Sequence, residues 1–118
     1  MNPTECLALL FDAMNQKSLD ALGDILADDA VFHFPKTAPL KGKKRIVTFM
    51  KLLFRKYPNL TFQVGRITGD PVCAAAEWTN SGDTKTGDHY ENAGVTFLEM
   101  NNGKIIYLSD TFKDTDRF

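Results

Sequence analysis

Residues 101–114, which read NNGKIIYLSDTFKD, combine a hairpin turn with an apolar strand that carries a carboxylate. The Asn-Asn-Gly sequence at 101–103 is a strong hairpin signal, because Asn and Gly tolerate the positive φ angles that such turns require. A strand has a period of two residues, so four side chains share one face of the segment that follows: Ile106, Leu108, Asp110 and Phe112. An ionised carboxylate among apolar side chains needs a partner, a proton or a water-filled cavity. The environment of Asp110 is therefore the functional question for the whole chain.

The bulk composition is that of one soluble globular domain. The 118 residues suffice for a single core, and the contents of 43% hydrophobic and 25% charged residues are ordinary for this class. A formal net charge of −1 provides no basic excess for binding nucleic acid. The N-terminus lacks the pattern of a secretory signal, and no stretch reaches the roughly 18 apolar residues of a membrane span. We therefore expect one cytoplasmic domain over residues 1–118 that binds neither nucleic acid nor a membrane.

The sequence contains no pattern typical of a metal or cofactor site. Its two cysteines, Cys6 and Cys73, are far apart, and we interpret both as small apolar side chains of the core. No metal-ligand spacing, Gly-rich phosphate loop or nucleophile elbow is present. We therefore expect neither a metal nor a cofactor.

The order of the periodic segments predicts the fold class. Apolar residues recur at helical spacing over 2–16, 18–30 and 43–58, and Asn2 with Glu5 forms a capping-box pattern at the first of these. Extended segments are predicted at 30–35, 60–70, 72–82, 87–100 and 104–112, with a loop at 36–42. This order predicts an α+β domain in which three N-terminal helices pack on one face of a curved, mostly antiparallel sheet.

Several short motifs occur in a characteristic order. They are LADDAVFHF (26–34), LKGKKRIVTFM (40–50), EWTNSG (77–82), YENAGVTF (90–97) and the C-terminal segment quoted above. Together they resemble the SnoaL-like and ketosteroid-isomerase-like families of the nuclear transport factor 2-like superfamily, over nearly the whole chain. The resemblance implies a cystatin-like cone with a mostly apolar pocket between the helices and the concave face of the sheet. It also implies a homodimer that pairs through the outer face of the sheet.

The resemblance further implies a carboxylate on the last strand as general acid or base, and Asp110 occupies such a position. A carboxyl group in a partly dry cavity has a raised pKa, which suits proton transfer near neutral pH. The alternative is an acid that is ion-paired with an arginine or lysine. His33 is the second catalytic candidate if its strand face is concave, and otherwise it contacts solvent or a second subunit. Glu77 replaces Asp110 as the buried acid if the two sheet faces are exchanged.

Further residues are expected to line the pocket. Trp78 follows three alanines that leave space for a ligand, and its indole supplies an aromatic wall with one N–H donor. Tyr90 precedes Asn92, and in relatives with a similar Tyr-x-Asn the asparagine often points into the cone. We therefore expect Asn92 to hydrogen-bond with Asp110 or with a ligand carbonyl. The remaining expected lining residues are apolar: Phe11, Met50, Phe54 and Leu108.

Two hypotheses from different function classes follow. In the first, the chain is a cofactor-free isomerase, cyclase or dehydratase that transfers protons on a small hydrophobic carbonyl or hydroxyl compound. In the second, it is a non-catalytic domain that binds a small hydrophobic ligand or dimerises. Two differences from enzymatic relatives disfavour particular reactions within the first hypothesis. The strand at 76–80 lacks the arginine of the epoxide-hydrolase branch, and the first helix has Phe11 and Asp12 where the steroid-isomerase branch has a tyrosine.

Overall fold

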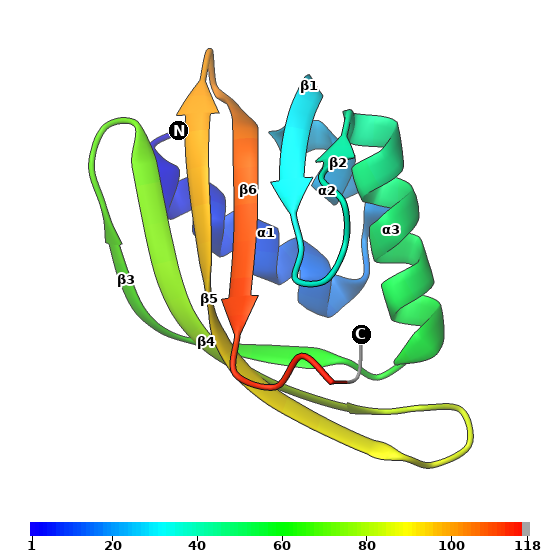
Figure 1. The fold of residues 1–118 in the computed structure, drawn as a ribbon. Coiled ribbons are helices and arrows are strands. Elements are labelled where there is room, and N and C mark those ends of the chain that lie inside the picture. The colour runs from blue at the N-terminus through cyan, green and yellow to red at the C-terminus, as the bar shows by residue number, and fades with distance from the viewer. Residues whose placement is uncertain (117–118) are drawn as a thin grey trace.

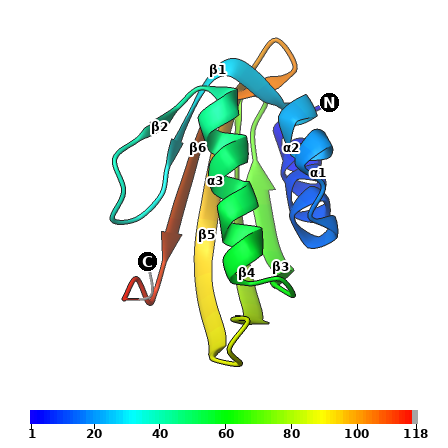
Figure 2. The ribbon, with the colours of Figure 1, turned by 90° about the vertical axis from the view of Figure 1, so that its right-hand side faces the viewer.

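The computed structural model describes residues 1–116 of the chain. Within them three helices and six strands follow one another: α1 (Pro3–Gln16), α2 (Leu19–Ile25), β1 (Leu26–His33), β2 (Leu40–Lys41), α3 (Lys43–Lys56), β3 (Thr61–Gly69), β4 (Cys73–Asp83), β5 (His89–Asn101) and β6 (Lys104–Phe112). Figures 1 and 2 show all three helices on one side of a curved sheet. The predicted α+β architecture is therefore confirmed. No helix in the described residues is long and apolar enough to cross a membrane.

Helix α1 begins with the predicted capping box. The Asn2 side chain accepts a hydrogen bond from the Glu5 amide at 2.9 Å, and Glu5 Oε1 accepts one from the Asn2 amide at 3.5 Å. These two bonds satisfy backbone amides at the helix N-terminus. The helix then buries the apolar residues that recur at helical spacing along it: Leu7, Leu10, Phe11 and Met14.

The second helix is shorter than its apolar spacing predicts. Helix α2 ends at Ile25, and β1 begins at Leu26 with backbone angles of φ −95° and ψ 136°. Leu26 is buried and pairs with Ile105 of β6. The prediction of helix up to residue 30 is therefore wrong, because pairing with a neighbouring strand overrides local helical spacing.

The strands form one sheet in the order β2-β1-β6-β5-β4-β3. All neighbours are antiparallel except β1 and β6, which are parallel. Strand β2 lies in the segment that was predicted to be loop. The predicted hairpin between β5 and β6 is confirmed, with Asn102 at φ 52° and Gly103 at φ 77°. Strand β6, which carries Asp110, therefore lies inside the sheet between β1 and β5.

A β-bulge beyond this hairpin decides which side chains face one another. Next to the turn Met100 pairs with Ile105, but farther along the pairing shifts by one residue, so that Thr96 pairs with Asp110. The bulge also buries Ile105 completely, whereas the alternation predicted Ile106 in that place. The register around Asp110 is thus set by an irregularity of the sheet.

Two hydrophobic residues of β6 share the inner face of the sheet with Asp110, as the alternation predicted. Leu108 and Phe112 are buried on either side of Asp110 along the strand. Phe112 pairs with Gly94, which in turn pairs with Trp78. A Cβ atom on Gly94 would lie 2.8 Å from Trp78 Cζ2, so the position requires glycine for the indole to lie over β5.

Candidate functional site

An apolar cavity lies between the inner face of the sheet and helices α1 and α3. Its volume is about 30 Å³, whereas a water molecule needs roughly 10–15 Å³ on this measure. Three polar side chains line it: Asn80, Tyr90 and Asp110. The apolar lining includes Met14, Met50 and Leu53 from the helices and Phe62, Trp78 and Phe112 from the sheet. The described state is therefore closed, and a ligand larger than water has to displace side chains.

Two hydrogen bonds in series hold the Asp110 carboxylate. Thr96 Oγ1 donates to Asp110 Oδ1 at 2.7 Å, and Trp78 Nε1 donates to Thr96 Oγ1 at 2.9 Å. Thr96 is buried beside Asp110 because the two residues pair across β5 and β6. Within residues 1–116, no hydrogen bond reaches the second carboxylate oxygen, Oδ2. One oxygen is thus fixed while the other is available to a ligand.

The surroundings of Asp110 favour the protonated acid. Burial raises the pKa of Asp110 to about 6, although the hydrogen bond from Thr96 acts in the opposite direction. Among the described residues, no lysine or arginine forms an ion pair with this carboxylate. Arg45, Arg55 and Arg66, the arginines of the ion-paired alternative, therefore do not pair with Asp110 in the described part of the chain. A carboxyl group with this pKa can both accept and release a proton near neutral pH.

His33 does not lie in the cavity. It pairs with Ser109, the residue before Asp110 on β6, and consecutive strand residues point to opposite faces. The side chain is exposed on the outer face, with its ring centroid 5.2 Å from that of Tyr107. The expectation that His33 and Asp110 share one site is therefore corrected, because the face of His33 is not the concave one.

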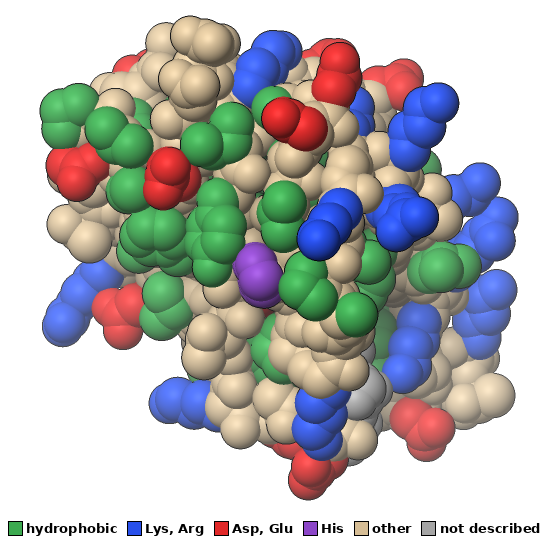
Figure 3. All heavy atoms as spheres, turned by 45° about the horizontal axis from the view of Figure 1, so that its top comes forward, with side chains coloured by type: hydrophobic (Ala, Val, Ile, Leu, Met, Phe, Trp, Pro, Cys, Tyr) green, Lys and Arg blue, Asp and Glu red, His purple; other side chains and the backbone are tan. Residues whose placement is uncertain are grey.

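The outer face of the sheet is partly apolar. Val95 and Phe97 are 40% and 38% exposed, and the Phe97 ring packs edge-on against Tyr107 at 6.0 Å. Figure 3 shows hydrophobic side chains gathered on the side where this face of the sheet turns to the viewer. Glu77 also lies there, 3.8 Å from Arg66, so it does not replace Asp110 as the buried acid.

Only some of the predicted binding residues line the cavity. Three of them do: Met50, Trp78 and Tyr90. Three others are not part of its lining: Phe11, Phe54 and Leu108. Phe11 packs against Phe62 with ring centroids 5.5 Å apart, and Leu108 is 1% exposed in the core. Phe11 therefore contacts a residue of the cavity wall, whereas Leu108 belongs to the core.

Asn92 hydrogen-bonds with Tyr90 and with the backbone of Asp114, and not with Asp110 as expected. Its Nδ2 donates to the Asp114 carbonyl at 2.6 Å and to the Tyr90 hydroxyl at 3.0 Å, and its Oδ1 accepts from the Asp114 amide at 3.1 Å. Asn92 therefore links β5 to the segment that follows β6. The hydrogen-bond partner of Asp110 is Thr96 instead.

Sequence reasoning missed two polar residues of this site. Thr96 was not singled out because the bulge that brings it opposite Asp110 leaves no clear sequence signal. Asn80 lines the cavity at 8% exposure, and its Oδ1 has no hydrogen-bond partner in the described part of the chain. Its position two residues after Trp78 on the same strand face was the available signal, since side chains at i and i+2 share a face.

Potential metal ligands are dispersed in the described residues. Nowhere between residues 1 and 116 do three His, Cys, Asp or Glu side chains form a group that could hold a metal ion. Cys6 and Cys73 are free, and burial raises the pKa of the Cys6 thiol to about 11.

The sequence and the fold were both compared with those of known proteins. The sequence model of the SnoaL-like domain matches residues 7–108. No curated protein matches the sequence. A candidate SnoaL-like polyketide cyclase from Jannaschia sp. CCS1 superposes with a TM-score of 0.85 at 18% identity, covering 92% of this chain and 83% of that one.

Two further solved structures have similar folds. A candidate polyketide cyclase from Pseudomonas putida KT2440 gives a TM-score of 0.84 at 23% identity, over 99% of this chain and 96% of that one. An LEH-like epoxide hydrolase from M. tuberculosis gives 0.81 at 17% identity, over 93% and 81% of the two chains. At such identities the likeness concerns the fold alone.

Proposed function

Because this chain belongs to the SnoaL-like family, we propose that it is a cofactor-free enzyme that transfers protons on a small hydrophobic carbonyl or hydroxyl compound. Asp110 is the general acid and base in this proposal. The observation that carries it is the placement of one carboxyl group, with a pKa of about 6, at the wall of an apolar cavity. Oδ1 is held by Thr96, while Oδ2 makes no hydrogen bond within residues 1–116.

The proposed chemistry is proton abstraction and return at carbon. The Asp110 carboxylate removes a proton from a carbon next to a carbonyl group, and the resulting acid returns the proton to the same or another atom of the substrate. The apolar walls exclude water, which strengthens the interaction of the carboxyl group with the substrate. Trp78 acts through Thr96 as a positioning residue, because it orients the hydroxyl that holds Oδ1.

Isomerisation, aldol-type cyclisation and dehydration all include such a step. The two structural neighbours that are candidate polyketide cyclases support a cyclisation or a related reaction. Epoxide hydrolysis has less support, although one neighbour is an LEH-like epoxide hydrolase, because the segment at 76–80 contains no arginine.

The closed cavity constrains the substrate. A volume of about 30 Å³ holds no organic molecule, so Met14, Met50 and Leu53 have to move outward when a substrate enters. Methionine is suited to this because its unbranched side chain changes rotamer easily. The substrate is therefore compact, and its entry separates α1 and α3 slightly from the sheet.

Exchange of carbon-bound protons tests the proposal without knowledge of the complete reaction. Small aryl and alicyclic ketones are incubated with the protein in D₂O, and loss of the signals next to the carbonyl is followed by NMR. We expect the wild-type chain to accelerate exchange for a ketone that binds, and Asp110→Asn to abolish the acceleration while binding remains. Ketones that bind without any accelerated exchange would contradict the enzyme proposal.

The second candidate function is a non-catalytic ligand-binding domain that dimerises. The exposed apolar side chains of the outer sheet face, Val95 and Phe97, favour pairing with a second copy through this face. Sedimentation of the wild-type chain and of Phe97→Lys tests the pairing. A dimer that becomes a monomer on substitution supports this interface, and a monomeric wild-type chain excludes it.

A further inference from the structure

A second polar position lies in the cavity away from Asp110. Asn80 is four residues beyond Ala76 on β4, and Ala76 is in register with Thr96 and Asp110 on the neighbouring strands. With a rise of about 3.3 Å per residue, the backbone positions are about 13 Å apart along the strand direction, and the two side chains line the same small cavity. The cavity therefore has two polar ends.

The side-chain oxygen of Asn80 is buried without a partner. The residue is 8% exposed, and Oδ1 receives no hydrogen bond from any group in residues 1–116. Such an oxygen is unfavourable in a folded chain unless a water molecule or a ligand satisfies it. The feature therefore indicates a position where an outside donor binds.

The amide orientation of Asn80 is consistent with this role. Burial raises the pKa of Tyr90, and hydrogen bonds from the side chains of Asn92 and Asn80 act against that rise. The Asn80 side chain thus lies beside the Tyr90 hydroxyl, and Oδ1 is the atom of its amide without a partner in the described residues.

Neighbouring backbone donors are already engaged. The Phe62 amide donates to Asn15 Oδ1 at 2.7 Å, and the Leu60 amide donates to the Tyr57 carbonyl at 3.1 Å. Leu60 and Phe62 line the same cavity as Asn80, yet neither amide is available to it. These two backbone amides therefore do not satisfy Asn80 Oδ1, which stays without a partner in residues 1–116.

The wall between the two polar ends is aromatic. The Phe62 and Trp78 rings meet edge-on at 5.3 Å, and Trp78 lies 6.2 Å from Phe112. Flat ring systems pack well against such walls. The lining thus complements a flat, apolar ligand with a polar group at each end.

We propose that Asn80 is a specificity-determining residue whose Oδ1 accepts a hydrogen bond from a hydroxyl group of the ligand. The substrate class is then a flat hydroxyketone, with its carbonyl end at Asp110 and its hydroxyl end at Asn80. The assignment of the carbonyl end rests on the proposed function, whereas the assignment of the hydroxyl end does not.

Matched probe pairs test this inference. The pairs are acetophenone with 4-hydroxyacetophenone and 2-acetylnaphthalene with 6-acetyl-2-naphthol, which differ only by the hydroxyl group. Binding is followed through the indole N–H signal of Trp78, the single tryptophan of the chain, which lines the cavity. In at least one pair we expect the wild-type chain to bind the hydroxyl compound about tenfold more tightly, as one satisfied hydrogen bond allows. In Asn80→Leu the ratio should fall to about one.

Two controls separate the possible explanations. Thr79→Val changes the exposed neighbour of Asn80 on the opposite face of β4 and should keep the preference. Asp110→Asn should abolish proton exchange and also keep the preference, so the two proposals can fail independently. Equal wild-type affinities within both pairs would overturn the inference, because Asn80 would then bind water only. A preference that persists in Asn80→Leu, or no binding of any probe, would overturn it as well.

Discussion

The Thr96 hydroxyl lies between the Trp78 indole and the Asp110 carboxylate, 2.9 Å from Trp78 Nε1 and 2.7 Å from Asp110 Oδ1. An indole N–H can only donate, so the hydroxyl accepts from Trp78 and directs its own hydrogen at Asp110. The group that holds the carboxylate is therefore oriented before a ligand arrives, as preorganised sites require.

Replacement of Thr96 by valine should alter both ends of this chain of hydrogen bonds. The pKa of Asp110 should rise above about 6, because the Thr96 hydrogen bond is the effect that lowers it. The free energy of unfolding should fall by about 1–2 kcal/mol, since the Trp78 N–H loses its acceptor in a buried place. Carbon-detected NMR of the carboxyl group and urea unfolding measure the two effects. Thr96→Ser keeps the hydroxyl and serves as the control, and an unchanged pKa in Thr96→Val would contradict the assignment.

The raised pKa of Asp110 should make the folded state less stable as pH increases. The ordinary value is 3.8 and the folded value is about 6, so the folded chain binds this proton more tightly than the unfolded chain. The stabilisation is present below about pH 4 and is lost as pH rises to about 6, with a total of up to about 3 kcal/mol. Urea unfolding across this range should show the loss in the wild-type chain.

Asp110→Asn provides the comparison for that experiment. The variant should be more stable than the wild-type chain at neutral pH and should lack the contribution of Asp110 to the pH dependence. Asp70 and Asp83, whose pKa values are lowered by hydrogen bonds, contribute with the opposite sign but equally in both chains. The difference between the two stability curves therefore isolates Asp110, and identical curves would show that its carboxyl group is not buried as described.

The limits of sequence-based prediction are clearest around Asp110. Alternation along β6 correctly placed Leu108, Asp110 and Phe112 on one face of the strand, whereas it left open which sheet face is concave and placed Ile106 where Ile105 is buried. The partner of Asp110 could not be predicted, since an uninterrupted hairpin from the Asn-Asn-Gly turn would pair it with Val95. One bulged residue moves the pairing to Thr96, and nothing in the local sequence specifies that bulge.

Other differences have the same physical origin. The face of His33 could not be assigned from the sequence, because the orientation of β1 depends on its parallel pairing with β6, which lies far away in the chain. The helix predicted up to residue 30 likewise ends early because Leu26 joins that pairing. The pattern within a segment predicted its type well, whereas contacts between distant segments decided its ends and its facing side.

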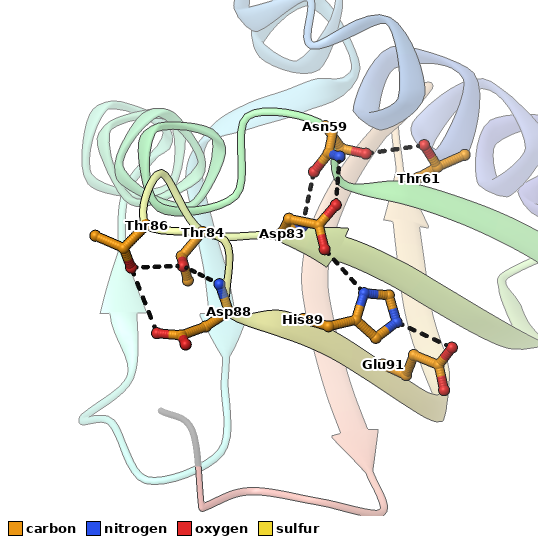
Figure 4. A network of polar contacts seen from close by, with 8 residues as sticks. All are labelled: Asn59, Thr61, Asp83, Thr84, Thr86, Asp88, His89 and Glu91. Atoms are coloured by element: carbon orange, nitrogen blue, oxygen red, sulfur yellow. Dashed lines mark hydrogen bonds and ion pairs between the residues drawn. The ribbon is translucent and has the colours of Figure 1, made fainter.

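His89 should stabilise the end of the β4–β5 hairpin when it is protonated. Its ring lies between the side chains of Asp83 and Glu91 (Figure 4), with Nδ1 2.9 Å from Asp83 Oδ1 and Nε2 3.1 Å from Glu91 Oε1. The two ring nitrogens can both donate only when the imidazole is protonated. The hydrogen bond to Asp83 raises the pKa of His89 most, and the hydrogen bond to Glu91 raises it further. Asn59, in the loop after α3, also contacts Asp83. Its Nδ2 donates to Asp83 Oδ2 at 2.9 Å, and its Oδ1 accepts a hydrogen bond from the Asp83 amide at 2.7 Å.

The sign of the pH effect follows from this raised pKa. The stabilisation is fully present below the ordinary pKa of histidine and is lost as pH rises through the raised value. Amide exchange of residues 83–89 should therefore show less protection, after correction for the intrinsic pH effect, above the His89 pKa than below it. An NMR titration of the His89 ring supplies that pKa, and Glu91→Gln should lower it. Equal pKa values in both chains would show that Glu91 does not pair with the ring.

Replacement of Gly94 by alanine should disturb the site from beneath Trp78. The new Cβ would collide with the Thr111 carbonyl oxygen and would lie 2.8 Å from Trp78 Cζ2, so the strand or the indole has to move. We expect a loss of about 2–3 kcal/mol in the free energy of unfolding, as for overpacking of a core, together with a shift of the Trp78 indole signal. Gly23→Ala is the matched control, because a Cβ in α2 would meet nothing within 4 Å and alanine favours a helix by up to about 1 kcal/mol. A Gly94→Ala chain as stable as the wild type, with an unmoved indole signal, would show that Trp78 does not lie over β5.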